Sequence, residues 1–265
     1  MDISTKNASR FTGFSDVYDE ARPRMPQYPT EIITRYLGKR PELVVDLGCG
    51  TGLSTLAWKS RSAAVIGIEP NDDMRAAANK KAGGTVSFKK AFAHDTGLRD
   101  NCADAVVCSQ SFHWMNPGLT LAEVNRILKP GGIFATVDYD WPPVCAWEGE
   151  AAYARLFFEV DRLQEADDEL KDASVRWEKS GHMDNIKNSG HFRYCREILF
   201  ANRETCTAQR FIGMAMSQGG LQSVLRRMPE RIEGALNEYR KTVRRLFADE
   251  TFEMDICYRM RLGVK

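Results

Sequence analysis

The sequence predicts an α/β fold in which a doubly wound, mostly parallel sheet is followed by a mostly helical C-terminal cap. Three observations support this. From residue 29 to residue 140, short apolar segments alternate with segments of helical length, and a glycine-rich turn follows the first apolar segment. After residue 144 the alternation ends and charged, helix-like segments follow. Strands alternating with helices of about 10 to 15 residues are typical of a parallel sheet covered on both faces.

The first half is expected to hold five strands and the helices between them. The strands are predicted at 43–48, 63–69, 85–92, 104–110 and 133–140, and the helices at 53–60, 71–82 and 117–128. Residues 129–132, Lys-Pro-Gly-Gly, follow the last of these helices. We expect them to terminate it, because proline cannot continue a helix and glycine adopts positive φ.

The second half is expected to add two strands and the cap. The strands are predicted at 191–200 and 250–264, where apolar and mostly polar residues alternate from Phe252 to Leu262 in the second. They would complete a seven-stranded sheet, with cap helices from 145–190 and 205–248. The basic stretch 187–248 is interpreted either as a solvated helical face or as a source of contacts to an acidic substrate, from the following residues: Arg193, Arg196, Arg203 and Arg210.

Composition narrows the class of protein. A net charge of +1 gives no reason to expect nucleic acid or a membrane surface as a partner. The seven cysteines contain no C-x-x-C pair, which favours the reduced thiols of a cytosolic protein. No stretch approaches the roughly 18 apolar residues that a membrane span needs. These features predict a cytoplasmic protein.

The stretch "VVDLGCGTG" (44–52) carries the first specific signal. Gly48, Gly50 and Gly52 alternate where the first strand turns into a helix. Such a loop brings backbone N–H groups and a helix N-terminus to a ligand at the carboxyl end of the sheet. The dinucleotide pattern G-x-G-x-x-G requires glycine at position 53, which is Leu53 here. The spacing therefore disfavours a nicotinamide dinucleotide.

Three acids indicate another ligand. Glu69 ends the second strand, 21 residues after Gly48, where an acid can accept both hydroxyls of a ribose. Asp46, just before the glycines, is placed to bind an ammonium group. Asp95, after the third strand, is placed to accept from an exocyclic amine such as that of adenine. A ribose, an adenine and an amino-acid ammonium together describe S-adenosylmethionine.

Five motifs extend this interpretation to a family. In order and spacing, "VVDLGCGTG", "IGIEPNDDM", "AFAHDTGL", "DAVVCSQSFHWM" and "RILKPGGIFATVDY" resemble the motifs of class I S-adenosylmethionine-dependent methyltransferases with a type 11 methyltransferase domain. The segment "YDEARPRMPQYP" (18–29) and the His-Trp pair resemble the small-molecule group similar to trans-aconitate methyltransferase. The resemblance implies a Rossmann-like sheet, an N-terminal lid helix within 1–28, a cofactor-binding core at 29–144, and a cap with the last two strands at 145–265.

The resemblance also implies the site. The cofactor-binding residues would be Tyr18, Arg22, Asp46, Gly48, Gly50, Gly52, Glu69, Pro70, Met74, Ala93, His94, Asp95, Ser109 and Gln110. The glycines would make room for the methionine part, with Asp46 behind them. Glu69 would bind the ribose, Met74 would pack on the adenine, and residues 93–95 would lie at its edge. Residues 109–110 would lie under the sulfonium, and the lid residues near the methionine carboxylate or the substrate.

Four residues are candidates for substrate contact: His113, Trp114, Tyr139 and Trp141. His113 follows the fourth strand, and an unperturbed imidazole titrates near neutrality, so it is also a candidate general base. The alternative is that His113 packs and hydrogen-bonds within its loop. No histidine lies at metal-ligand spacing from another ligand, so no metal is predicted.

The predicted function is methyl transfer from S-adenosylmethionine, with S-adenosylhomocysteine as product, to a small-molecule acceptor. O-methylation of a carboxylate or hydroxyl is favoured over C- or N-methylation of a quinone, polyketide or other metabolite. The alternative of another class is a non-catalytic, regulatory S-adenosylmethionine-binding module. An RNA or protein methyltransferase and a nicotinamide oxidoreductase are weaker alternatives. A monomer and a homodimer are both compatible with the sequence.

Overall fold

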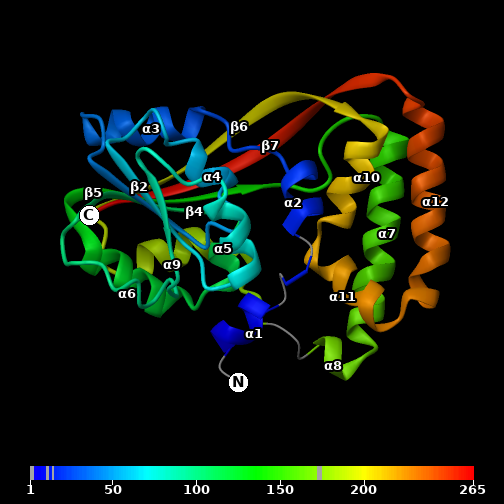
Figure 1. Cartoon of the computed structure of the whole chain (residues 1–265), viewed down its shortest axis with the longest axis horizontal. Helices are drawn as coiled ribbons and strands as arrows, with labels where there is room; N and C mark the ends of the chain where they lie inside the picture. Colours follow the sequence, from blue (N-terminus) through cyan, green and yellow to red (C-terminus); the bar gives the residue numbers. More distant parts are fainter. Residues whose placement is uncertain (1–2, 10–11, 14, 172–174) are drawn as a thin grey trace.

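A seven-stranded sheet forms the centre of one of the two parts of the molecule. The computed structural model describes residues 3–9, 12–13, 15–171 and 175–265. The strands are β1 (Leu43–Leu47), β2 (Ala64–Ile68), β3 (Val86–Lys89), β4 (Ala103–Ser109), β5 (Leu128–Tyr139), β6 (Tyr194–Thr207) and β7 (Thr251–Val264). Their order is β3-β2-β1-β4-β5-β7-β6 (Figure 1). The first five are parallel, and β7 is antiparallel to β5 and β6. The predicted doubly wound, seven-stranded fold class is confirmed.

Helices cover both faces of the sheet. They are α3 (Tyr28–Leu37), α4 (Leu53–Leu56), α5 (Asp72–Asn79), the 3-10 turn η1 (Phe112–Trp114), α6 (Pro117–Ile127) and α9 (His182–Asn188). Val44 belongs to one apolar cluster together with Ile32 and Ile33 of α3. Its neighbour Val45 belongs to a second cluster, which contains Leu121 of α6. Successive side chains of a strand point to opposite faces, so β1 is buried on both sides.

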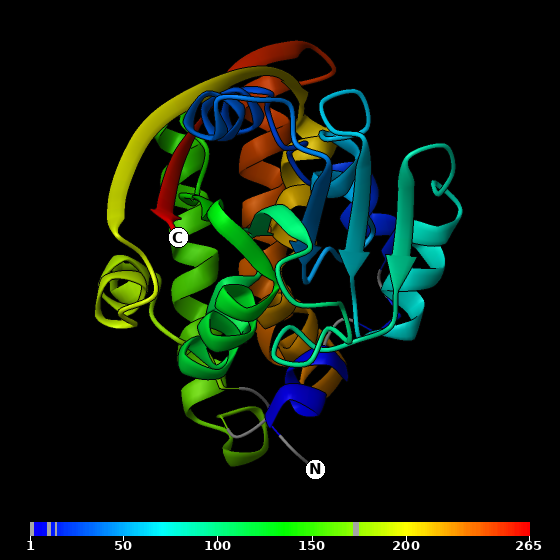
Figure 2. The same cartoon turned by 90° about the vertical axis from the view of Figure 1, so that its left-hand side faces the viewer.

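The cap and the N-terminal helices form the other part of the molecule. The elements are α1 (Ile3–Ser9), α2 (Ser15–Ala21), α7 (Trp147–Glu165), α8 (Asp168–Lys171), the 3-10 turn η2 (Lys179–Gly181), α10 (Ala208–Met216), α11 (Gly219–Arg227) and α12 (Pro229–Phe247). The long helices α7 and α12 lie side by side, with α10 and α11 beside them (Figure 1). Helix α2 packs on α10. The carboxyl ends of β1, β2 and β3 point toward the side on which α1 lies (Figure 2).

Several elements differ from the sequence expectation: β3 and α5 are shorter than predicted, and three larger differences follow. The helix predicted at 53–60 ends at Leu56, because the chain changes to i→i+3 hydrogen bonds from Ala57 to Arg61. The helix at 117–128 does end before the Lys-Pro-Gly-Gly segment, but that segment belongs to an irregular start of β5. The partner of Ala103 is Leu128 and that of Ala105 is Ile133, so the extra residues form a bulge.

The third difference is the length of the strands that connect the sheet to the cap. β6 was predicted at 191–200, but it spans 14 residues and pairs with β7 along its whole length. β6 and β7 extend beyond the other five strands of the sheet toward α10 and α12 (Figure 1). Helix α9, which falls in the range expected to form the cap, packs on β6, β7 and α6 instead. No helix in the described parts of the chain is long and apolar enough to cross a membrane.

Candidate functional site

The glycine loop joins β1 to α4, and its three glycines have different surroundings. All three have positive φ, 65° at Gly48, 55° at Gly50 and 85° at Gly52. A Cβ on Gly48 would lie 2.7 Å from Met115 Cε, and one on Gly52 would lie 2.8 Å from Phe88 Cζ. A Cβ on Gly50 would meet no atom within 4 Å. Packing therefore requires the outer two glycines, while the middle one faces open space.

Glu69 lies directly beside this loop, because Leu47 of β1 pairs with Ile68 of β2. Its Oε2 accepts a hydrogen bond from the Gly50 N–H (2.9 Å), and its Oε1 accepts one from the Asn71 N–H (2.8 Å). Burial raises the pKa of the Glu69 carboxyl to about 7, although the two N–H groups oppose the shift. Each carboxylate oxygen still has a free acceptor position for a ligand hydroxyl.

Asp46 lies behind the loop and is fully buried. Its Oδ2 accepts hydrogen bonds from the hydroxyls of Ser54 (2.6 Å) and Thr55 (2.7 Å). Its Oδ1 has no hydrogen-bond partner among the described residues. Burial raises the pKa of the Asp46 carboxyl to about 6, against the two hydroxyl donors. A buried acceptor without a donor is costly.

A first cavity opens in front of the loop. Most of the predicted cofactor-binding residues line it, namely Tyr18, Arg22, Gly48, Gly50, Glu69, Pro70, Met74, Ala93, His94, Ser109 and Gln110. Asp46 and Gly52 do not line it, because they lie behind the loop and against Phe88. Asp95 does not line it either, since its side chain is exposed to solvent. The expectation that Asp95 borders the ligand is therefore corrected: the Phe92 and His94 rings, stacked at 5.6 Å, form that part of the wall.

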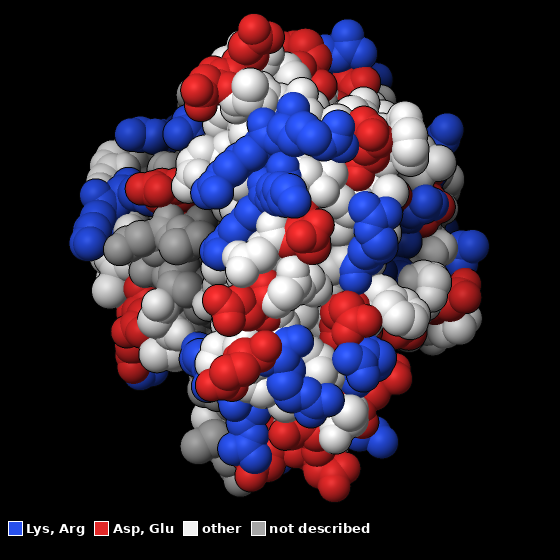
Figure 3. All heavy atoms as spheres, turned by 90° about the vertical axis from the view of Figure 1, so that its right-hand side faces the viewer, with Lys and Arg blue, Asp and Glu red and all other residues white. Residues whose placement is uncertain are grey.

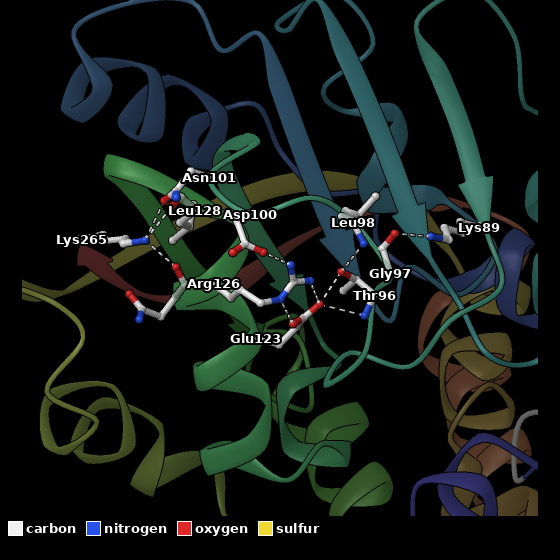
Figure 4. A network of polar contacts seen from close by, with 11 residues as sticks. Lys89, Thr96, Gly97, Leu98, Asp100, Asn101, Glu123, Arg126, Leu128 and Lys265 are labelled. Atoms are coloured by element: carbon white, nitrogen blue, oxygen red, sulfur yellow. Dashed lines mark hydrogen bonds and ion pairs between the residues drawn. The ribbon is translucent and has the colours of Figure 1, made fainter.

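A polar network outside the first cavity supports this wall. The N–H and the hydroxyl of Thr96 both donate to Glu123 of α6, and Arg126 donates to Glu123 and Asp100 (Figure 4). Thr96 is fully buried. The network therefore fixes the segment that follows His94 to α6.

Helix α1 completes the first cavity, and the sequence analysis did not identify its residues. Ser4, Asn7 and Ala8 line the cavity. Asn7 Nδ2 donates to the Trp114 carbonyl (2.8 Å), and Asn71 Nδ2 donates to the Ala8 carbonyl (2.9 Å). The sequence of α1 contains no motif, and these bonds join residues far apart along the chain, so they could be found only in the structure.

Arg22 is a buried cation between the lid and the cap. Its guanidinium donates to the Tyr139 hydroxyl (3.0 Å) and the Ser217 carbonyl (2.9 Å), and lies 4.7 Å from the centre of the Tyr18 ring and 5.1 Å from that of Trp141. No ion pair links it to an acid of the described residues, and its Nε has no hydrogen-bond partner there. A buried charge without a counter-ion is unfavourable, so the position favours an anionic ligand.

A second cavity adjoins the first one. It has a volume of about 500 Å³, within the usual range for small-molecule sites. The residues common to both cavities are Tyr18, Arg22, Gln110 and Trp114. Of the other predicted substrate residues, His113 and Trp141 line the second cavity, whereas Tyr139 lines the first. The cap supplies the rest of the wall, including Tyr153, Phe157, Lys179 and Gln218.

His113 is buried in the wall of the second cavity. Its Nδ1 lies 3.8 Å from Asp138 Oδ1. Burial and the positive charge of Lys179 hold the pKa of the His113 imidazole well below its ordinary value, although Asp138 opposes this. The imidazole is therefore neutral at neutral pH. Its low proton affinity makes it a weak general base.

Asp138 of β5 is the centre of a buried charge cluster that the sequence analysis missed. It accepts from His182 Nδ1 (3.2 Å) and Arg261 Nη1 (3.3 Å), and Lys179 Nζ lies 3.4 Å away. Burial alone would raise the pKa of the Asp138 carboxyl, but His182 and Lys179 outweigh burial and hold it below its ordinary value. The partners come from segments without a motif, so no sequence signal indicated them. No group of three metal-ligating side chains is found in the part of the chain that the structure describes.

The basic stretch 187–248 contributes little to either cavity. Arg203 pairs with Asp255 at 2.8 Å, and Arg210 forms an ion pair with Glu204 at 2.5 Å. Neither arginine lines the two cavities. On the cap side of the molecule, basic and acidic side chains alternate over much of the surface (Figure 3). The interpretation as a solvated face fits Arg203, which is 66% exposed, whereas Arg210 is only 24% exposed and is held by Glu204.

In this fold a glycine loop and an acid meet at the carboxyl ends of β1 and β2, which is the arrangement expected of a class I methyltransferase domain. Residues 45–136 match the family model described as methyltransferase domain. Residues 45–136 are therefore similar to a methyltransferase domain, in agreement with the sequence resemblance.

Relatives agree with this resemblance. An uncharacterized methyltransferase of Mycobacterium tuberculosis is 35% identical over 115 residues, 43% of this chain and 46% of the relative. An S-adenosylmethionine-dependent methyltransferase of Saccharomyces cerevisiae, named as probable, is 32% identical over 132 residues, 47% of this chain and 45% of the relative. The chain thus spans about half the length of these curated relatives.

Solved structures show the same fold along most of the chain. A protein of Anaeromyxobacter dehalogenans assigned as a type II methyltransferase superposes with a TM-score of 0.67 at 21% identity, covering 92% of this chain and 97% of that chain. The YcgJ protein of Bacillus subtilis superposes with a TM-score of 0.55 at 17% identity, covering 91% of this chain and 99% of that chain. At these identities the likeness concerns the fold.

Proposed function

We propose that the protein transfers a methyl group from S-adenosylmethionine, bound in the first cavity, to a small-molecule acceptor bound in the second. The observation that carries this proposal is the shared wall of the two cavities, formed by Tyr18, Arg22, Gln110 and Trp114. Two adjoining sites with a common wall allow donor and acceptor to be held in line, which contributes much of the acceleration in a displacement reaction.

The residues of the first cavity fit this cofactor. Glu69 presents two carboxylate oxygens for the ribose hydroxyls, and Met74 and Pro70 provide an apolar surface for the adenine. Arg22 lacks a carboxylate partner in the described chain, which suits the methionine carboxylate. Asp46 was predicted to bind the ammonium group, but it is buried behind the loop and accepts from the hydroxyls of Ser54 and Thr55, so its role in the proposal is to support the loop.

When bound, S-adenosylmethionine supplies a methyl carbon activated by the sulfonium, and the C–S electron pair remains on sulfur as the acceptor bonds to carbon. The chain's own residues bind and orient the donor and the acceptor, and they exclude water. Trp114 and Tyr18 line both cavities, and residues of α1 line the first cavity. Because desolvation strengthens the interactions of a nucleophile with its surroundings, enclosure of the reacting groups by these residues favours transfer.

We further propose that the acceptor is O-methylated on a carboxylate or hydroxyl, with C- and N-methylation as the alternatives. The weak basicity of the buried His113 supports the carboxylate, which is already ionised at neutral pH, whereas a hydroxyl acceptor would have to lose its proton to another group. We retain the division into a lid (1–28), a core (29–144) and a cap with the last strands (145–265), and a cytoplasmic location, as parts of the proposal.

The test is a transfer assay with S-adenosylmethionine labelled in its methyl group. Purified protein would be incubated with panels of carboxylic acids, phenols, amines and quinones, and label would be followed into each acceptor. The proposal predicts labelled acceptor and an equal amount of S-adenosylhomocysteine. Binding of S-adenosylhomocysteine without transfer to any panel would favour a non-catalytic binding module.

A further inference from the structure

We propose that Lys179 is the anion-binding residue of the second cavity and that the methyl acceptor is a small organic carboxylate with a flat apolar body. This inference rests on the proposed function, because it names the class of acceptor for the same site.

The position of Lys179 is the first reason. Its Nζ donates to Gln110 Oε1 over 2.7 Å, and Gln110 belongs to the shared wall of both cavities. Gln110 has a φ of 53°, an unusual value for a residue other than glycine, and residues in such conformations cluster at functional sites. The ammonium group therefore lies close to the point where donor and acceptor would meet.

The charge balance around Lys179 is the second reason. Asp138, 3.4 Å away, also accepts from His182 and Arg261, so its negative charge is shared. An ammonium group has three N–H donors, and the hydrogen bond to Gln110 uses one of them, so a donor remains for a ligand. The side chain of Lys179 is only 22% exposed, so an anion at that donor would be weakly screened.

The other charges of the cavity wall agree with an anion. Lys179 is accompanied by Arg22, which has no carboxylate partner in the described chain, and by Arg176, which lies over the Trp114 ring. The acids of the wall, Asp161 and Glu165, have largely exposed side chains, although partial burial raises the pKa of the Asp161 carboxyl and Arg176 opposes this shift. The more deeply buried charges on this wall, Arg22 and Lys179, are positive.

The aromatic part of the wall suggests the body of the acceptor. Trp141 and Tyr153 are stacked at 5.8 Å with planes only 3° apart, and Tyr153 stacks on Phe157 at 4.4 Å. Trp114 lies on the same cavity. Flat rings favour flat apolar ligands through dispersion and offset stacking. An aryl or unsaturated carboxylate combines this body with an anionic end.

The chemistry of a carboxylate also suits the rest of the site. It is ionised at neutral pH, so no proton has to be removed before transfer. If Lys179 binds one carboxylate oxygen, the other oxygen keeps its lone pair for the new bond to the methyl carbon. The neutral, weakly basic His113 would then serve as a wall residue.

The test uses ligand binding to the protein saturated with S-adenosylhomocysteine, which cannot transfer a methyl group. Benzoate, phenylacetate and cinnamate would be titrated by calorimetry, each against its neutral amide. We expect at least one acid to bind about tenfold or more tightly than its amide, the effect of a charge-assisted hydrogen bond. Lys179→Gln should abolish this preference. Lys179→Arg should retain most of it, and Lys187→Gln, on the exposed face of α9, should leave it unchanged.

The outcomes separate the inference from the proposed function. If S-adenosylhomocysteine binds but no acid is preferred over its amide, or if Lys179→Gln keeps the preference, the inference is overturned and the cofactor site remains. If S-adenosylhomocysteine does not bind the wild-type protein, the proposed function itself fails. Should Lys179→Gln unfold, Lys179→Arg still supports the inference if it prefers the acid over the amide. A wild-type protein without that preference still overturns the inference.

Discussion

The backbone N–H of Gly50 donates a hydrogen bond to Oε2 of Glu69 over 2.9 Å, joining the glycine loop to the end of β2. The two features are 19 residues apart along the chain and come together because β1 and β2 are adjacent parallel strands. Glu69 thus has two roles. It fixes the loop conformation, and it presents the remaining acceptor positions of its carboxylate to the first cavity.

The first prediction concerns the pH dependence of cofactor binding. In the free protein the pKa of Glu69 is raised to about 7, above its ordinary value of 4.5, so below about pH 7 the carboxyl is largely protonated. Binding of the ribose requires the ionised form, so each bound ligand must displace a proton there. The affinity for S-adenosylhomocysteine should therefore rise about tenfold from pH 6 to pH 8, with about half of the ionised form present at pH 7, and level off above pH 8.

Calorimetry at several pH values, in buffers of different ionisation enthalpy, would measure this change and the protons released. Glu69→Gln should bind with an affinity that varies much less over the same range. A wild-type affinity that is constant from pH 6 to pH 8 would show that the protonation of Glu69 is not linked to binding.

The second prediction compares two alanine substitutions in the loop. Gly50→Ala should cost about 1 kcal/mol of stability through its left-handed backbone, while its Cβ enters open space in the first cavity and weakens ligand binding. Gly48→Ala should cost about 1–3 kcal/mol more, because its Cβ would overlap Met115 and Ser111. Urea denaturation and calorimetry would measure both. Equal losses of stability would contradict this assignment.

Much of the fold could be predicted, because the strands and helices of residues 29–140 follow from local sequence patterns. Buried parallel strands such as β1 read as apolar runs, and a residue such as Asn71, whose side chain accepts from the Met74 N–H, begins a helix. The loop at 48–52 and Glu69 were found for the same reason, since each motif lies on a single strand end. The early end of α4 was missed, because the change to i→i+3 hydrogen bonds after Leu56 has no counterpart in the hydrophobic pattern.

Only part of the second cavity could be predicted: His113, Trp114 and Trp141 follow recognised strands, whereas the cap residues of its wall come from segments with no periodic motif. Asp138 was within a recognised strand, but its partners Lys179, His182 and Arg261 are 41 to 123 residues away in the chain. Similarly, the hydrogen bond from the Asn7 side chain to the Trp114 carbonyl depends on the path of the N-terminal segment. The exposure of Asp95 depends on a local turn that hydropathy does not reveal.

The third prediction concerns the Asp138 cluster. Asp138→Asn should leave the buried Lys179 and Arg261 without their shared counter-ion, and we expect a loss of about 3 kcal/mol in the free energy of unfolding. Asp255→Asn removes a half-exposed partner of Arg203 and should cost less than about 1 kcal/mol. Denaturant titration of both variants at pH 7 would measure the difference. Similar small effects would mean that the Asp138 cluster contributes little to stability.

The most direct test of the cofactor site is a calorimetric titration of wild type and Glu69→Gln with S-adenosylhomocysteine at pH 8, where Glu69 is ionised. Glu42→Gln, outside both cavities, is the matched control. We predict tight binding by the wild type and the control, and about 10- to 100-fold weaker binding by Glu69→Gln, corresponding to the loss of charge-assisted hydrogen bonds. Wild-type protein that does not bind, or Glu69→Gln that binds as tightly as the control, would contradict the assignment of the first cavity to S-adenosylmethionine.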